Sequence, residues 1–103
     1  MAAVLPYVSW STATEAHVPI EEWDQLYASL QALKGHVQEY PGCQRFDVFV
    51  APGVDSVVVH CYTTWDTPEQ RDAFLEAGYT FERLLADLGG ATEQKSLTME
   101  KLF

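Results

Sequence analysis

The sequence predicts an α+β fold in which helices cover one face of a four-stranded antiparallel sheet. Two observations carry this prediction. Short segments of alternating apolar residues mark four strands, and apolar residues at helical spacing mark two longer segments between them. A length of 103 residues allows one domain, so we treat residues 1–103 as a single unit.

The N-terminal part of the chain contains a strand and then a long helix. β-Branched and aromatic residues from Val4 to Ala13 predict the strand. The helix runs from Pro19 to about Tyr40, where gaps of three and four residues separate apolar side chains such as Leu26, Leu30 and Leu33. Pro19 suits the first helical position, and the Pro41-Gly42 pair ends the helix.

Two further strands come next and are joined by a short loop. Residues Gln44 to Ala51 and Ser56 to Trp65 each alternate in the pattern of a strand. The connection Pro52-Gly53-Val54-Asp55 is a turn sequence, so the two strands should form an antiparallel hairpin.

A second helix and a last strand complete the chain. Thr67 and Gln70 resemble a capping box at the start of the helix, Gly78 should kink or split it, and Gly89-Gly90 should end it. Its acidic residues should form a solvated face; they are Glu69, Asp72, Glu76, Glu82 and Asp87. Residues Gln94 to Phe103 alternate as a strand.

The resulting β-α-β-β-α-β order is that of the ferredoxin-like fold. Because crossover connections are right-handed, both helices should lie on the same face of the sheet. The strands, however, are apolar or aromatic on both faces. Val57, Val59, Cys61 and Trp65 alternate with Val58, His60, Tyr62 and Thr64. The uncovered face therefore predicts a homodimer whose sheets face each other.

Composition excludes several classes of partner. The chain has 6 basic and 15 acidic residues, for a net charge of −9, which argues against a nucleic acid or an anionic membrane as partner. No signal-peptide pattern and no apolar run of about 20 residues is present. The two cysteines, Cys43 and Cys61, do not make a disulfide framework or a zinc site, so we expect reduced thiols in a cytoplasmic protein.

Two segments resemble the antibiotic biosynthesis monooxygenase (ABM) family. The stretch Pro41-Gly42-Cys43-Gln44-Arg45-Phe46 is similar to a segment of that family, and Tyr62-Thr63-Thr64-Trp65 is similar to its strand that ends in Trp. The resemblance covers nearly the whole chain. It implies a dimeric α/β barrel with a ligand cavity between helices and sheet in each subunit.

The resemblance also implies several chemistries. Some members of the family oxygenate quinols or anthrones without a metal or flavin, and others degrade haem. The haem branch uses a histidine ligand on the second helix, but residues 67–88 contain no histidine, and Phe74 replaces the helical Trp of that branch. The polyketide branch can carry an Asn where this chain has Cys61. We therefore expect no cofactor and disfavour haem degradation.

Three residues are candidates for catalysis. Trp65 could stack on a flat substrate and donate its indole N–H, although a core anchor would also suit the end of this strand. Tyr79 follows the expected helix break and could protonate an oxyanion. His36 flanks the apolar stripe of the first helix and could serve as a base.

Four further residues are candidates for substrate binding: Cys61, Arg83, Ser9 and Phe74. Cys61 should share a sheet face with Trp65, but a small buried residue there is equally in keeping with a core. Arg83 could hold a negative group or pair with Asp87 or Glu82. The three histidines, His17 on a loop, His36 on a helix and His60 on a strand, show no metal-binding spacing.

The sequence thus favours a small cofactor-independent monooxygenase that acts on a flat phenolic, quinol or anthrone-type molecule. Two alternatives remain open. One is a non-oxidative cyclase, isomerase or lyase on the same fold, and the other is a dimer that binds a ligand without catalysis.

Overall fold

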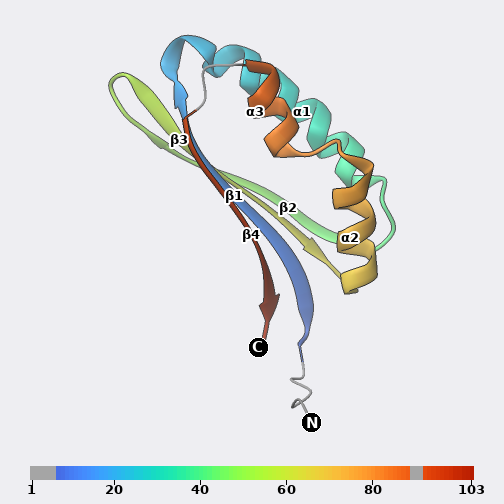
Figure 1. Cartoon of the computed structure of the whole chain (residues 1–103). Helices are drawn as coiled ribbons and strands as arrows, with labels where there is room; N and C mark the ends of the chain where they lie inside the picture. The colour runs from blue at the N-terminus through green and yellow to red at the C-terminus, as the bar shows by residue number, and fades with distance from the viewer. Residues whose placement is uncertain (1–6, 89–91) are drawn as a thin grey trace.

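A computed structural model describes residues 7–88 and 92–103 and shows a sheet with helices packed on one face only (Figure 1). The ferredoxin-like element order is confirmed. The elements are β1 (Ser9–Pro19), the 3-10 turn η1 (Ile20–Glu22), α1 (Trp23–Gln38), β2 (Cys43–Pro52), β3 (Ser56–Trp65), α2 (Pro68–Ala77), α3 (Phe81–Leu88) and β4 (Thr92–Lys101). No helix within the described ranges is long and apolar enough to cross a membrane.

The four strands are antiparallel and lie in the order β2-β3-β1-β4. β1 and β3 occupy the centre, and each of the two edge strands pairs with one of them. The long β1–β3 ladder places Trp10 opposite Trp65 and Val18 opposite Val57. This register decides which side chains face the helices, because directly paired residues lie on the same face of a sheet.

The first strand differs from the prediction in its position. It runs from Ser9 to Pro19, whereas the sequence predicts Val4 to Ala13, and residues 4–6 of that expectation lie outside the described part of the chain. His17 is therefore a strand residue opposite Val58, and it does not lie on a loop. The shift has a tertiary cause, since pairing with the full length of β3 keeps the polar segment around Thr12 to Glu15 extended.

The start of the first helix shifts with that strand. Pro19 is extended, with ψ of 142°, and precedes a 3-10 turn, so α1 itself begins only at Trp23. Proline is tolerated at the end of a strand because the missing N–H removes no interior ladder bond. The predicted apolar stripe is nevertheless the buried one, since Leu26, Leu30, Leu33 and Val37 of α1 all face the sheet.

The second helix is split at Gly78, as the sequence predicts. Gly78 adopts a left-handed conformation with φ of 82° and ends α2, and α3 starts at Phe81. Thr67 caps α2 by accepting a hydrogen bond from the Gln70 backbone N–H at 3.2 Å. The reciprocal half of the capping box is absent, because the Gln70 side chain instead lies against Gly42, where any Cβ would collide with it. The predicted stop at Gly89-Gly90 lies outside the described residues.

The core lies between the helices and the inner face of the two central strands. Val57, Val59, Cys61 and Trp65 of β3 are all buried there, together with Ala16 and Val18 of β1. From the helices come the α1 stripe and the buried side chains Phe74, Phe81 and Leu85. The predicted alternation of β3 is therefore confirmed.

The position of Glu82 shows that the predicted solvated face of acidic residues on the second helix is wrong at this residue. Its carboxylate accepts hydrogen bonds from Thr14 Oγ1 at 2.6 Å and Ser96 Oγ at 2.9 Å, so it joins α3 to β1 and β4. Burial by itself would raise the pKa of Glu82, but the hydrogen bonds, with that of Thr14 foremost, bring the pKa below its usual value of 4.5. Helical periodicity alone does not reveal this contact, because the hydroxyls come from distant strands.

We expect Glu82→Gln to destabilise the protein in a pH-dependent way. Because the folded pKa is lowered, the carboxylate stabilises the fold above the unfolded pKa, and this contribution is lost as the pH falls through the folded value. The variant should lose about 1 kcal/mol at pH 7, less than a fully buried charged hydrogen bond contributes, because Glu82 remains half exposed to solvent. Urea unfolding at pH 7 and pH 3 measures the difference.

The exposed Glu76 of α2 provides the matched control for this experiment. Glu76→Gln should leave the free energy of unfolding within about 0.5 kcal/mol of wild type at both pH values. Equal stability of Glu82→Gln and wild type at pH 7 would contradict the structural role assigned to this carboxylate.

Candidate functional site

Five rings from two helices, one strand and two connecting segments form a contiguous aromatic cluster on the helix side of the sheet. It consists of His36, Tyr40, Trp65, Phe74 and Tyr79. Tyr40 is central: its ring centroid lies 5.1 Å from that of His36, 6.2 Å from Trp65 and 5.7 Å from Phe74. Trp65 and Phe74 lie 5.1 Å apart, and His36 and Tyr79 lie 4.6 Å apart. We call this set the aromatic cluster.

Local structure explains how these rings meet. His36 lies in the last turn of α1, and Tyr40 follows four residues later, so both project from the same end of that helix. Trp65 is the last residue of β3, and Phe74 is on the buried side of α2. Tyr79 enters from the link that begins at Gly78. The structure therefore brings together four of the residues singled out in the sequence: His36, Trp65, Phe74 and Tyr79.

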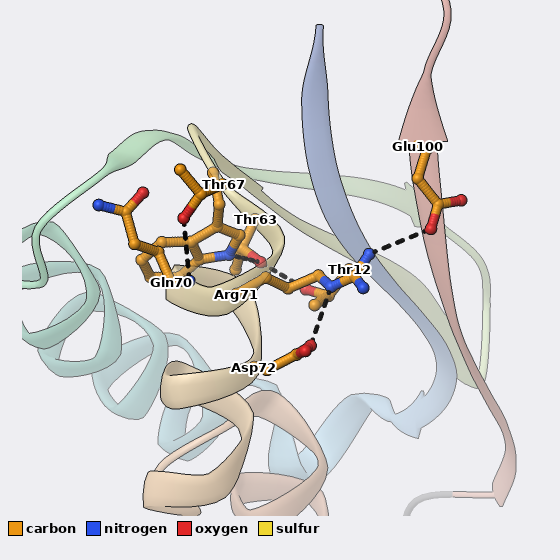
Figure 2. Close-up of polar contacts among 8 residues, drawn as sticks. Thr12, Thr63, Thr67, Gln70, Arg71, Asp72 and Glu100 are labelled. Carbon is orange, nitrogen blue, oxygen red and sulfur yellow. Dashed lines mark hydrogen bonds and ion pairs between the residues drawn. The ribbon is translucent and has the colours of Figure 1, made fainter. Parts of the chain in front are cut away.

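Trp65 is fully buried, and its polar atom is already used. Its indole Nε1–H donates to Thr63 Oγ1 at 2.8 Å, and Thr63 is in turn hydrogen-bonded to Thr12 across the β1–β3 ladder (Figure 2). In this conformation the indole cannot donate to a substrate. Trp65 acts here as an anchor of the core and forms a wall of the aromatic cluster.

His36 differs from Trp65 because one of its two ring nitrogens, Nε2, has no hydrogen-bond partner among the described residues. The Nε2 atom is buried and makes no hydrogen bond, while the ring packs between Tyr40 and Tyr79. A buried polar atom without a partner costs about 1–3 kcal/mol, so such atoms are rare in folded proteins. The imidazole thus presents an unused acceptor or donor to a largely aromatic environment.

Arg71 is a buried charged residue that the sequence reasoning missed. Only 9% of it is exposed, and it extends from α2 toward β1 and β4 (Figure 2). Its Nε lies 3.3 Å from Asp72 Oδ1 and its Nη1 lies 3.6 Å from Glu100 Oε1, but Nη1 has no hydrogen-bond partner in the part of the chain that the structure describes. Arg71 precedes Phe74 by three residues, so the two lie on the same side of the helix. This spacing could have predicted from the sequence that Arg71 is buried.

The remaining candidates are not part of the aromatic cluster. Cys61 is buried on the helix-facing side of β3, with Thr14 and Val48 as its cross-strand neighbours. Arg83 is exposed on α3 and makes no ion pair with Asp87 or Glu82. Ser9 is buried at the start of β1, opposite Lys101 of β4.

The pKa values of both thiols are raised above the usual value. Burial is the main cause that raises the pKa of Cys61 to about 12, and the charges of Glu82 and Asp47 add to it. Burial also raises the pKa of Cys43 above its usual value. Cys61 is therefore not a nucleophile near neutral pH. Within residues 7–88 and 92–103, no three His, Cys, Asp or Glu side chains converge in the manner that a metal ion requires.

Of the hollows on the described part of the surface, two well-formed ones contain no residue of the aromatic cluster in their walls. One, of about 380 Å³, lies between α1 and β2 and includes Tyr27 and Phe46 in its wall. The other, of about 230 Å³, lies on the helix-free face of the sheet and includes His60, Tyr62 and Leu97. The rings of the aromatic cluster thus pack against one another in this conformation.

Comparison with known proteins identifies the fold. No family model matches the sequence, and no curated protein matches it either. Solved structures do match. A protein from Nitrosomonas europaea, provisionally assigned as an antibiotic biosynthesis monooxygenase, has a TM-score of 0.77 at 18% identity over 98% of this chain and 97% of its own. A conserved protein from Methanosarcina mazei has a TM-score of 0.74 at 12% identity over 92% and 94%.

A third structure has a described activity. SnoaB from Streptomyces nogalater, a cofactor-independent oxygenase crystallised as an asparagine variant, has a TM-score of 0.69 at 13% identity over 89% of this chain and 91% of its own. At such identities the likeness concerns the fold. This chain has the ferredoxin-like fold of structures that are named antibiotic biosynthesis monooxygenases, in agreement with the resemblance seen in its sequence.

Thiol labelling tests the assigned state of Cys61. With a pKa of about 12, roughly one Cys61 thiol in 10,000 is ionised at pH 8, so native Cys43→Ser protein should react with Ellman's reagent far more slowly than a free thiol. Urea should restore the rate. Cys61→Ser, which keeps the half-buried Cys43, is the matched control and should react faster. Fast labelling of native Cys43→Ser protein would show that Cys61 is accessible and ionisable.

Proposed function

We propose that this chain is an ABM-like, cofactor-independent monooxygenase that acts on a flat phenolic, quinol or anthrone-type substrate. The observation that carries the proposal is the buried, unpartnered Nε2 of His36 within the aromatic cluster. An imidazole among aromatic rings suits the removal of a proton from an aromatic carbon acid or phenol. The shared fold with a cofactor-independent oxygenase supports the same reaction class.

With O₂ as the oxidant, the proposed reaction uses two side chains of the aromatic cluster. His36 would take a proton from the ring CH₂ of an anthrone-type substrate, which leaves an electron-rich carbanion. This carbanion reduces O₂ and forms a C–O bond, and loss of water then gives the ketone, so that R₂CH₂ and O₂ become R₂C=O and H₂O. Tyr79, whose ring lies 4.6 Å from that of His36, would protonate the peroxide oxygen and recover its proton from His36.

The packed cluster must open to admit a substrate. Tyr79 is held by the short link between α2 and α3, and this link begins at Gly78, whose φ of 82° leaves it outside both helices. Helix-terminal links of this kind can absorb backbone rotation, so a movement here would separate Tyr79 from His36. Trp65 and Phe74 would then form the walls against which the substrate ring packs.

Oxygen consumption tests this proposal directly. Wild-type protein should consume O₂ above background with anthrone or a naphthoquinol as substrate. Loss of the base should lower kcat about 100-fold in His36→Gln, and loss of the phenol should lower it about tenfold in Tyr79→Phe. His17→Gln, a histidine change on the opposite face of the sheet, is the matched control and should retain the wild-type rate. Background uptake across such substrates, or full activity of His36→Gln, would refute the proposal.

The two alternatives give different outcomes in the same assay. A non-oxidative cyclase, isomerase or lyase would convert its substrate equally well without oxygen. A ligand-binding dimer without catalysis would show no rate for any variant to lose, and Tyr79→Phe and Trp65→Phe would change only stability or affinity.

We also propose that two copies pair through the helix-free faces of their sheets. Aromatic and aliphatic side chains are exposed there: Phe49 is 58% exposed and Leu97 is 54% exposed. Tyr62 contacts Phe49 at a ring distance of 5.9 Å and stacks on His60 at 6.4 Å. A face this apolar is costly to leave in water, and a second sheet of the same shape would cover it.

Light scattering measures the assembly. Wild-type protein should have about twice the mass of the 11.6 kDa chain at micromolar concentration. Leu97→Glu places a charge in the proposed interface and should shift the mass toward that of one chain. Val54→Glu, at a loop position that is 92% exposed, is the matched control and should leave the mass unchanged. A wild-type mass of one chain would overturn the pairing.

A further inference from the structure

Few buried side chains hold α2 on the sheet, although this helix carries one wall of the aromatic cluster. Of its ten residues, the structure buries only Arg71 and Phe74, whereas α1 buries four apolar side chains. Phe74 packs on Trp65 and Tyr40, so the position of α2 decides whether the cluster is closed. A charged side chain therefore makes one of the two buried contacts of α2.

Arg71 connects α2 to the edge strand β4. The helix packs on β1 and β3, so the side chain of Arg71 reaches past β1 before it meets Glu100 (Figure 2). Its Nη1 atom lies 3.6 Å from Glu100 Oε1, and its Nε atom lies 3.3 Å from Oδ1 of Asp72, which belongs to the same helix. The contact with Glu100 thus joins the helix to the sheet, whereas the contact with Asp72 lies within the helix.

The contact between Arg71 and Glu100 is close but incomplete. A nitrogen–oxygen distance of 3.6 Å exceeds that of an ordinary hydrogen bond, and the buried Nη1 atom has no hydrogen-bond partner among the described residues. A buried ion pair of this kind stabilises a fold less than an apolar contact of the same size does. The Glu100 side chain is partly exposed, so water can hydrate its carboxylate when the contact breaks. The contact therefore holds α2 in place but can be released at a modest cost.

The C-terminal end of α2 has room to move. Gly78 ends the helix with a φ of 82°, and an added Cβ there would meet no described atom within 4 Å beyond its chain neighbours. Tyr79 follows directly, with its ring centroid 4.6 Å from that of His36. A displacement of α2 away from the sheet would thus take Phe74 from Trp65 and Tyr79 from His36.

We propose that the ion pair between Arg71 and Glu100 is a latch that holds α2 over the aromatic cluster. When the pair breaks, α2 moves away from the sheet together with Phe74, and the cluster opens. When the pair forms again, the cluster closes. The use of this opening to admit a substrate rests on the proposed monooxygenase function, but the latch can be measured without any substrate.

A thiol beneath the latch would report this opening. Thr12 is 8% exposed and faces the helices on β1, diagonal to Glu100 across the β1–β4 ladder. Thr12→Cys in a Cys43→Ser, Cys61→Ser background provides the only thiol of the chain, and we call this variant the reporter protein. N-ethylmaleimide is uncharged and reaches a buried thiol only in an open state, so its labelling rate follows the population of that state.

Glu100→Gln keeps the size of the side chain and removes its charge. In the reporter protein it should speed labelling about fivefold, as expected for the loss of one partly exposed ion pair. Asp72→Asn is the matched control and should leave the rate unchanged, because it removes a carboxylate from the same guanidinium but no link to the sheet. Thr63→Cys, at the position paired with Thr12, is a second reporter and should give the same ratios.

A further control separates local opening from a loss of overall stability. Glu82→Gln removes contacts of α3 and should lower the free energy of unfolding. It should leave the labelling rate unchanged, because these contacts stay in place when α2 opens. None of these rates depends on oxygen uptake, so the latch and the proposed monooxygenase activity are tested separately.

Three outcomes would overturn the proposal. The first is labelling of the reporter protein at the same rate with and without Glu100→Gln. The second is equal acceleration by Asp72→Asn or by Glu82→Gln. The third is labelling no faster than global unfolding allows, as measured in urea, which would show that α2 opens only when the whole chain unfolds.

Discussion

The burial of Trp65 between sheet and helices is the interaction on which the rest of the structure depends. Trp65 ends the central strand β3 and contacts Phe74 of α2 and Tyr40, which follows α1, so one side chain connects the sheet to α2 and to the end of α1. Its indole N–H is satisfied by Thr63, so the large ring is buried without an unpaired donor. The same packing sets the relative positions of His36 and Tyr79, which join the cluster through Tyr40 and through each other.

Polar groups that are buried beside this core differ in how many of their possible hydrogen bonds they make. Glu82 is fully used, since hydroxyls of two strands donate to its carboxylate. His36 Nε2 and Arg71 Nη1 lack hydrogen bonds although both atoms are buried. A fold tolerates such atoms at a free-energy cost, and functional sites are where that cost is commonly found. The unpartnered atoms of His36 and Arg71 therefore make these two residues stronger candidates for function than Cys61, whose thiol is kept protonated by burial.

Much of the fold could be predicted from the sequence, because alternation and helical spacing report directly on which side chains a sheet or helix buries. The β3 strand, the α1 stripe and the break at Gly78 follow from such local patterns. The position of β1 did not, because the polar residues Thr14 and Glu15, which lie beyond the predicted end at Ala13, are extended through pairing with neighbouring strands. The roles of Arg71 and Glu82 were not predicted, since the strand residues that they contact, Glu100, Thr14 and Ser96, are 14 or more residues away in sequence.

The sequence by itself determined the order of the elements, the helix-facing side of β3 and the presence of His36, Trp65, Phe74 and Tyr79 as candidates. Each of these depends on residues that are close together in the sequence, so their spacing can be read from it directly. Only the tertiary structure decided which candidates meet, that the Trp65 indole donates to Thr63, and that a groove opens between α1 and β2. Those facts depend on the register between strands and on the packing of α1 over an edge strand, and neither leaves a local pattern in the sequence.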